Sequence, residues 1–182
     1  MEKDLTKYVH EKMMREAKNY QWRIVLDSHK RALEIYFVIT VDTEAERFVQ
    51  DINGQVNKTN ILQFEDVVCF YDETNHRLLP QNYFNAIPFH PEEGIDEGLV
   101  DAFLKQLNIV VSGSFIKLRE FLLDDSQGAF ELQWNEMNMQ KTVETLKATN
   151  RYSTNKRTFT ADNEKSIVEQ FKEDQEDGVE RV

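Results

Sequence analysis

Residues 22–41 read WRIVLDSHKRALEIYFVITV, and this stretch decides the fold class. Apolar residues recur at every second position on both sides of a polar break, Ser28-His29-Lys30-Arg31. A period of two is that of a strand with one buried face, and a short polar break between two such runs is typical of a hairpin. The stretch therefore predicts two antiparallel strands.

Working outward, the flanking segments change to a helical period. A single apolar stripe at three- and four-residue spacings predicts a helix over residues 4–19, and the same pattern predicts a long helix over about 95–123. Gly113 falls inside the long helix and costs it about 1 kcal/mol relative to alanine, so we expect a kink or a close backbone approach there. A further helix is expected over about 136–148.

Three more runs predict strands. Alternating or clustered apolar residues mark residues 62–70, 83–89 and 130–134. Pro88 suits an edge position or a strand end, because proline has no amide hydrogen for a ladder bond. Together with the hairpin these runs predict an α+β fold, a two-layer sandwich of a mainly antiparallel sheet of about five strands with helices on one face.

Residues 43–60 fit two structures. Thr43 and Glu46 make a capping box before a short helical apolar face, and Gly54 suits the end of a helix. Asn53-Gly54 is equally the strongest two-residue hairpin signal. The choice stays open between helix, which we favour, and hairpin.

The domain division is predicted from where the apolar pattern weakens. We expect a single α+β domain over residues 1–148 and a polar segment over 149–182. Within that segment a short helix is expected around the apolar residues Ile167, Val168 and Phe171. The chain after it is acidic and expected to fray.

Composition limits the function classes. The 182 residues hold 22 Lys and Arg against 33 Asp and Glu, a formal net charge of −11. Nucleic-acid binding is not expected, because that affinity comes largely from neutralising phosphates with basic side chains. Apolar runs shorter than about 20 residues predict no membrane span, and the N-terminus predicts no secretory leader. The single cysteine, Cys69, is expected as a buried reduced thiol, so we expect a cytoplasmic protein.

Motifs for catalysis and ligand binding are missing. The histidines lie far apart, and the glycines approach no phosphate-binding loop, so no cofactor, metal site or catalytic residue is predicted. The densest carboxylates are Glu92, Glu93, Asp96, Glu97 and Asp101. Acidic residues at the start of a helix complement its exposed amides, which explains them without a ligand, although a divalent cation site stays open.

A basic window between Glu144 and Asp162 combines cations with aromatic residues. Its members are Lys147, Arg151, Tyr152, Lys156 and Arg157. Such a strip is suited to nucleic acid or an acidic partner. Because the net charge of the chain is negative, we favour docking of this strip on the acidic half of the chain itself over binding to nucleic acid.

The motifs that carry a resemblance to a known family are aromatic and structural. They are Phe64-Glu65-Asp66, Tyr71-Asp72, Tyr83-Phe84, Ile87-Pro88-Phe89, Gly94-Ile95 and Phe130-Glu131-Leu132-Gln133-Trp134. With them the chain resembles, over roughly residues 5–140, a family of small acidic proteins of unknown function from lactic-acid bacteria and related Gram-positive bacteria. The resemblance implies a bacterial cytoplasmic protein and carries over no catalytic residue. The order of elements is also loosely similar to that of the acidic type III secretion chaperones, which is an analogy of fold.

These observations favour a non-enzymatic protein. We expect a protein–protein interaction module or chaperone-like adaptor whose partner is another protein or a second copy of the chain. Its candidate contacts are exposed aromatic residues among Tyr36, Tyr71, Tyr83 and Trp134, although core packing competes for each. The alternative is a small-ligand-binding protein or a hydrolase whose carboxylates converge only in the fold.

Overall fold

The structure, a computed structural model, describes residues 3–42, 54, 56, 61–124 and 128–160, and the backbone of 168–171. The choice between helix and hairpin for 43–60 and the acidic tail predicted at the C-terminus fall outside these residues, positions 54 and 56 excepted. The elements in chain order are α1 (Leu5–Glu16), β1 (Gln21–Asp27), β2 (Ala32–Asp42), β3 (Ile61–Asp72), η1 (Pro80–Asn82), β4 (Asn85–Phe89), β5 (Ile95–Asp96), α2 (Glu97–Leu123), α3 (Glu136–Ala148), β6 (Lys156–Arg157) and β7 (Val168–Phe171).

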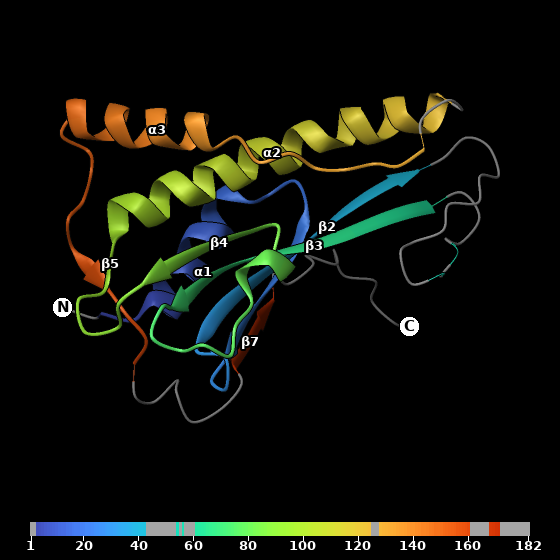
Figure 1. Cartoon of the computed structure of the whole chain (residues 1–182). Helices are drawn as coiled ribbons and strands as arrows, with labels where there is room; N and C mark the ends of the chain where they lie inside the picture. The colour runs from blue at the N-terminus through green and yellow to red at the C-terminus, as the bar shows by residue number, and fades with distance from the viewer. Residues whose placement is uncertain are drawn as a thin grey trace, which may run out of the picture.

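The main sheet confirms the predicted fold class. Its five strands lie in the order β4-β3-β2-β1-β7, and each neighbouring pair is antiparallel except β3 with β4. Figure 1 shows α2 and α3 lying along one face of the sheet. Pro88 lies in β4 at the sheet edge, as predicted, where its missing amide hydrogen removes no bond to a further strand.

The hairpin that opened the argument is present and has a defined turn. β1 and β2 pair from Gln21 opposite Val38 to Asp27 opposite Ala32. The Asp27 carboxylate accepts the backbone N–H groups of His29 and Lys30 at 2.9 and 3.0 Å. This Asx-type turn satisfies the amides of the polar break and so fixes the register.

The core lies between the sheet and the helices. Alternate residues of β2, among them Ile35, Phe37 and Ile39, are fully buried against apolar side chains of α1 and α2. Phe103 of α2 sits 4.9 Å from the Phe70 ring of β3, measured between centroids. A period-two face and a helical stripe therefore meet in one hydrophobic layer.

Among the described residues, α2 is the one helix that is long and apolar enough to cross a membrane, judged by length and composition alone. Its most apolar window is 44% buried inside the protein, through residues such as Phe103, Leu107 and Val111. This is the pattern of a core helix with one solvent-exposed face.

The strand predicted over residues 130–134 is wrong. The chain there is extended but forms no ladder with the described strands. Phe130 packs 5.5 Å from Phe64, and Trp134 packs 4.9 Å from Phe103, both between ring centroids. The alternation that suggested a strand arises because side chains point alternately into the core and into solvent.

The C-terminal segment differs from the prediction in two respects. The short helix expected near Val168 is wrong, because Val168–Phe171 is the strand β7, paired with β1. The segment also packs on the domain before that strand: β6 pairs with β5, and Phe159 is 7% exposed in the core. Backbone bonds join Leu5 N–H to Thr158 O at 2.9 Å and Thr158 N–H to Lys3 O at 2.8 Å.

Asp66 carries a carboxylate on the side of the sheet that faces the helices. Asp66 is opposite Phe37 in the register and therefore faces the helices, where it is half-buried. Burial raises the pKa of its carboxyl above 3.8, against a hydrogen bond from the Val67 N–H that lowers it. A raised acid pKa in the folded state costs stability above the unfolded pKa, and this cost disappears as the pH falls.

We therefore expect Asp66→Asn to raise the melting temperature at pH 7, with the gain over the parent protein shrinking as the pH approaches 4. Thermal unfolding at a series of pH values measures it. Glu131→Gln, the same change at an exposed position, should stay within about 0.5 kcal/mol at every pH. A less stable Asp66→Asn at pH 7 would contradict the argument.

Candidate functional site

The face of the sheet turned away from the helices carries the first group of interest. The register places Glu34 opposite Cys69, and Tyr36 opposite Val67, on that open face. Tyr71 belongs to the same face, since it packs with Ala32 and Cys69 in a small cluster separate from the main core. Three of the four aromatic residues predicted as contacts, Tyr36, Tyr71 and Tyr83, are thus on one side.

Glu34 is the centre of this group. Its residue surface is 3% exposed, which is unusual for a carboxylate. Tyr83 donates its hydroxyl hydrogen to Oε1 at 2.5 Å, Tyr36 donates to Oε2 at 2.8 Å, and the Lys30 ammonium donates to Oε1 at 2.9 Å. Buried charges persist when they are paired and hydrogen-bonded in this way. The carboxylate therefore holds both tyrosine rings in fixed positions.

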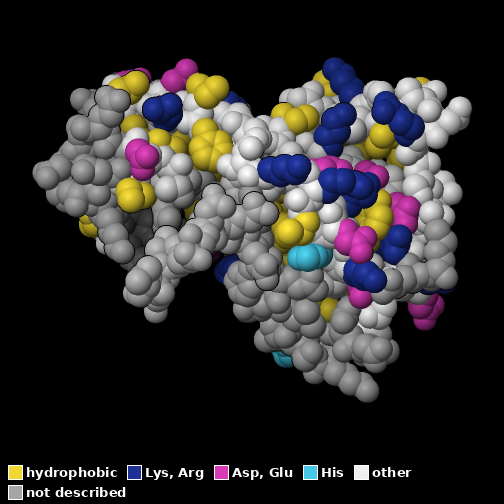
Figure 2. Space-filling model, turned by 180° about the vertical axis from the view of Figure 1, so that it is seen from behind, with side chains coloured by type: hydrophobic (Ala, Val, Ile, Leu, Met, Phe, Trp, Pro, Cys, Tyr) yellow, Lys and Arg dark blue, Asp and Glu magenta, His cyan; other side chains and the backbone are white. Residues whose placement is uncertain are grey.

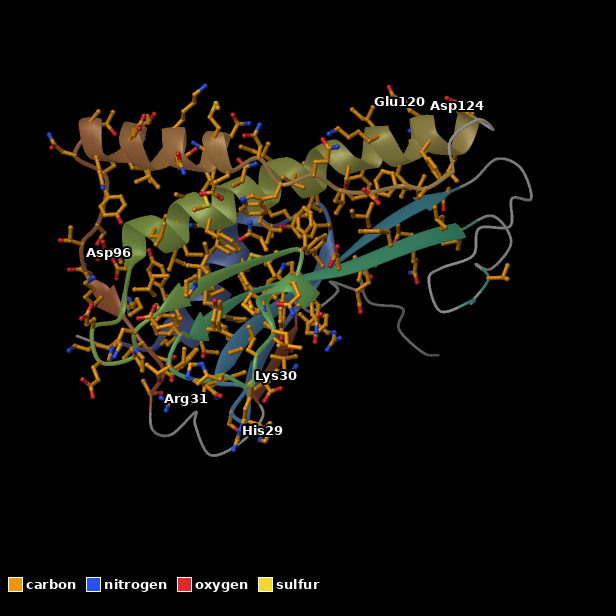
Figure 3. The ribbon with its side chains drawn as sticks, viewed as in Figure 1. His29, Lys30, Arg31, Asp96, Glu120 and Asp124 are labelled. Atoms are coloured by element: carbon orange, nitrogen blue, oxygen red, sulfur yellow. The ribbon has the colours of Figure 1, made fainter. Side chains whose placement is uncertain are left out.

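A cleft of about 270 Å³ lies over this network. Its lining includes Lys30, Glu34, Tyr36, Arg77, Leu79 and Tyr83. Leu79 is 53% exposed, and among the described residues no carboxylate lies within ion-pair distance of Arg77. Figure 3 shows Lys30 at the hairpin turn, on the far side of the sheet from α2 and α3. The cleft thus offers aromatic, apolar and cationic groups together.

Three ionisable groups of the cleft, Tyr36, Tyr83 and Lys30, are each held in one protonation state. Burial, helped by the hydrogen bond to Glu34, raises the pKa of Tyr36 to about 12, and the same causes raise the pKa of Tyr83. The hydrogen bond to Glu34 is the main reason that the pKa of Lys30 lies above its usual 10.5. The tyrosines therefore stay neutral and the lysine stays charged near neutral pH. Such groups suit binding better than general acid–base catalysis, which needs a pKa near the working pH.

The basic strip and the acidic start of α2 meet in the structure. Glu97, 7% exposed, accepts hydrogen bonds from Ser153 at 2.6 Å, Arg157 Nε at 2.7 Å and Asn155 at 3.2 Å. Arg157 Nη2 also lies 2.5 Å from Glu97 Oε1. Figure 2 shows Lys and Arg interleaved with Asp and Glu on this end of the molecule. This contact is the intramolecular docking that the charges favoured.

Asp96 and its neighbours complete the contact. Tyr152 donates to Asp96 at 2.9 Å, and Lys156 Nζ lies 2.9 Å from its other oxygen. The Lys147 ammonium lies 4.9 Å from the centre of the Tyr152 ring, while Arg151 is exposed. Gly98 is required beneath this ring, because an added Cβ would stand 2.5 Å from it. Most of the strip is thus engaged within the chain.

The carboxylates at the start of α2 are occupied by these partners rather than gathered around one point. Asp101 accepts from the Tyr8 hydroxyl and the Lys12 ammonium, each at 2.8 Å. Glu92 and Glu93 are exposed. Across the described ranges no group of three or more His, Cys, Asp or Glu is placed to hold a metal ion.

Two other predicted residues lie apart from the open face. Trp134 is half-buried on the helix side, with its ring 5.8 Å from that of Phe84. Cys69 is fully buried under the cleft, and burial raises the pKa of its thiol to about 12, so it is no nucleophile at neutral pH.

Sequence reasoning missed the residues that organise the cleft. In the sequence Glu34 is a polar position within an alternating apolar run, Lys30 lies in the polar break of the hairpin, and Arg77 lies in a polar stretch, so none of them stands out. The one available signal is the spacing of Glu34 and Tyr36, which places both on the same side of β2. Nothing local indicates that Tyr83, 49 residues further along, reaches the same carboxylate.

Comparisons with known proteins agree with the fold and leave the activity open. A solved structure of a conserved protein of unknown function from Enterococcus faecalis matches with a TM-score of 0.73 at 18% identity, covering 88% of this chain and 98% of that one. No curated protein is significantly similar in sequence. A family model described as "Protein of unknown function (DUF3013)" matches residues 1–160. The expected membership of a family of unknown function is thereby confirmed: the chain belongs to the DUF3013 family.

Proposed function

We propose that this protein is a non-enzymatic interaction module, a cytoplasmic adaptor that binds a partner protein through the cleft on the open face of its sheet. The observation that carries the proposal is the pair of tyrosine rings held by one buried carboxylate. Tyrosine is enriched at the few interface positions that dominate binding energy. Side chains fixed before binding lose less entropy on complex formation, so they add more to affinity.

The size of the cleft supports a protein surface as the ligand. Small-molecule sites usually enclose roughly 300–1,000 Å³, and the cleft, at about 270 Å³, is smaller and open. It would take one or two side chains of a partner. Arg77 calls for an acidic group on that partner, and Leu79 for an apolar neighbour of that group.

The alternative of a hydrolase with converging carboxylates has less support. Of the described residues that line the cleft, Glu34 is the one carboxylate, and three donors already occupy it. A second cavity of about 240 Å³ is lined, among the described residues, by Leu26, Ser28, Arg31 and Phe159, none of which is a carboxylate. Two-carboxylate chemistry needs both groups at one reacting centre.

The test is affinity purification of the tagged protein from its own cells, with Arg77→Glu and Leu79→Asp beside the parent sequence. We expect one stoichiometric partner that both variants lose. Lys141→Glu makes the same charge change as Arg77→Glu at an exposed position on α3, and should retain the partner. A partner held equally by all variants would place binding elsewhere, and a protein purified alone in every case would overturn the proposal.

A further inference from the structure

α2 has an exposed apolar face on its outer side. Ile109, Ile116 and Leu123 are 52%, 64% and 81% exposed and follow one another at seven-residue intervals. Residues seven apart lie on the same side of a helix, two turns along. Figure 1 shows the C-terminal half of α2 extending beyond α3, and Figure 3 shows Glu120 of that half pointing away from the sheet. Burying such a row of apolar side chains in an interface that excludes water is favourable.

Gly113 lies in the middle of this face and has open space beside it. Glycine in a helix interior costs about 1 kcal/mol relative to alanine. A Cβ added at Gly113 would meet no atom of the described residues within 4 Å, so a close backbone approach within the chain, one of the two explanations expected from the sequence, does not account for it. Its neighbour Ser112 is small and exposed. Small residues at one point on a helix let a second helix approach closely there.

The face is also self-complementary. About a point between Ser112 and Gly113, reversing the chain direction sets Ile109 against Ile116, and Lys105 against Glu120. Lys105 and Glu120 are both exposed. A two-fold axis brings the same patch of two subunits together, so each pairing occurs twice.

We propose that two copies of this chain dimerise through α2, packed antiparallel with Ser112 and Gly113 at the crossing point. Each Ile109 then packs on Ile116 of the partner subunit, and each Lys105 faces Glu120 of the partner subunit. The charge pattern fits a second copy as the partner, because opposite charges meet at both ends when the same sequence runs back along itself. This interface lies on the opposite side of the sheet from the cleft, so the dimer presents two separate clefts.

Sedimentation equilibrium or light scattering at about 0.15 M salt tests the dimer. We expect a mass of twice 21.5 kDa. Lys105→Glu or Glu120→Lys alone replaces two attractive contacts by two repulsive ones and should weaken dimerisation about tenfold. The double variant Lys105→Glu/Glu120→Lys should restore it, and Lys141→Glu should leave it unchanged. A monomeric parent protein, or a double variant as weak as the single ones, would overturn the proposal.

Gly113→Ala separates the interface from helix stability. At a concentration where the chain is monomeric, the added methyl should stabilise α2 against unfolding by about 1 kcal/mol. The same methyl at the crossing point should weaken dimerisation, because it holds the two helices apart. A more stable monomer together with weaker dimerisation supports the proposal. Unchanged or stronger dimerisation would contradict close packing at Gly113.

Discussion

Phe103→Ala is expected to lower the free energy of unfolding by about 4 kcal/mol, the usual cost of removing a fully buried phenylalanine. Phe103 is 0% exposed, and its ring lies 4.9 Å from the centroids of both Phe70 and Trp134. It therefore joins three parts of the molecule: α2, β3 and the extended segment over 128–135. Removing it leaves a cavity at the point where these parts meet.

Urea unfolding measures the loss of free energy, thermal unfolding followed by circular dichroism measures the melting temperature, and tryptophan fluorescence reports the hydration of Trp134. The melting temperature should fall by roughly 10 °C for a chain of this length, and the emission should shift to the red as Trp134 becomes hydrated. Met14→Ala removes a 46% exposed side chain from α1 and should cost about 0.5 kcal/mol or less. A loss below about 1 kcal/mol in Phe103→Ala would mean that the core does not close on this ring.

Glu97→Ala should cost about 3 kcal/mol, because it removes the carboxylate that Arg157 contacts at a site that exposes 16% of the arginine side chain. The hydrogen bonds from Ser153 and Asn155 to Glu97 are lost at the same time. The segment that carries β6 should then separate from the start of α2. Limited proteolysis should cut the variant between residues 149 and 160 much faster than the parent protein.

The effect of Glu97 should depend on pH. Burial raises the pKa of its carboxyl, but hydrogen bonds from Ser153, Arg157 and Asn155 with the charge of Arg157 outweigh this and hold the pKa below 4.5. A lowered acid pKa contributes stability above the unfolded value that disappears as the pH falls through the folded one. The difference between parent and variant should therefore be full at pH 7 and shrink below about pH 4.5.

Glu93→Ala is the matched control for Glu97→Ala. Glu93 precedes the same helix and is exposed, so its loss should change stability by about 0.5 kcal/mol or less at either pH. If both variants behave alike, the contact between Glu97 and the 151–159 segment does not stabilise the fold.

Residues 130–134 show why part of the fold was missed. Their apolar residues alternate as in a strand, and the side chains do alternate between core and solvent. Whether an extended chain forms a ladder depends on a free sheet edge beside it, and residues 130–134 lie against α2 and β3 side chains instead. The edge beside β1 is occupied by β7, whose short apolar pattern equally fitted a helix.

The site shows the same division. The tyrosines on the open face were named from the sequence because aromatic residues are frequent in interfaces, whereas Glu34 was not. A buried carboxylate is recognisable only by its donors, and those of Glu34 come from the hairpin turn, from its own strand and from the loop before β4. The docking of the basic strip followed from net charge alone, but its partners, Asp96 and Glu97, are about 60 residues away in the chain.

The sequence by itself determined the hairpin, the helices α1, α2 and α3 and the strands β2 and β3, because these depend on periodicity within a single segment. Only the tertiary structure decided which extended segments joined the sheet, which carboxylates found cations and which face of α2 stayed exposed. Those outcomes depend on contacts between residues far apart in the chain, and hydrogen bonds and ion pairs at such distances leave no periodic pattern in the sequence.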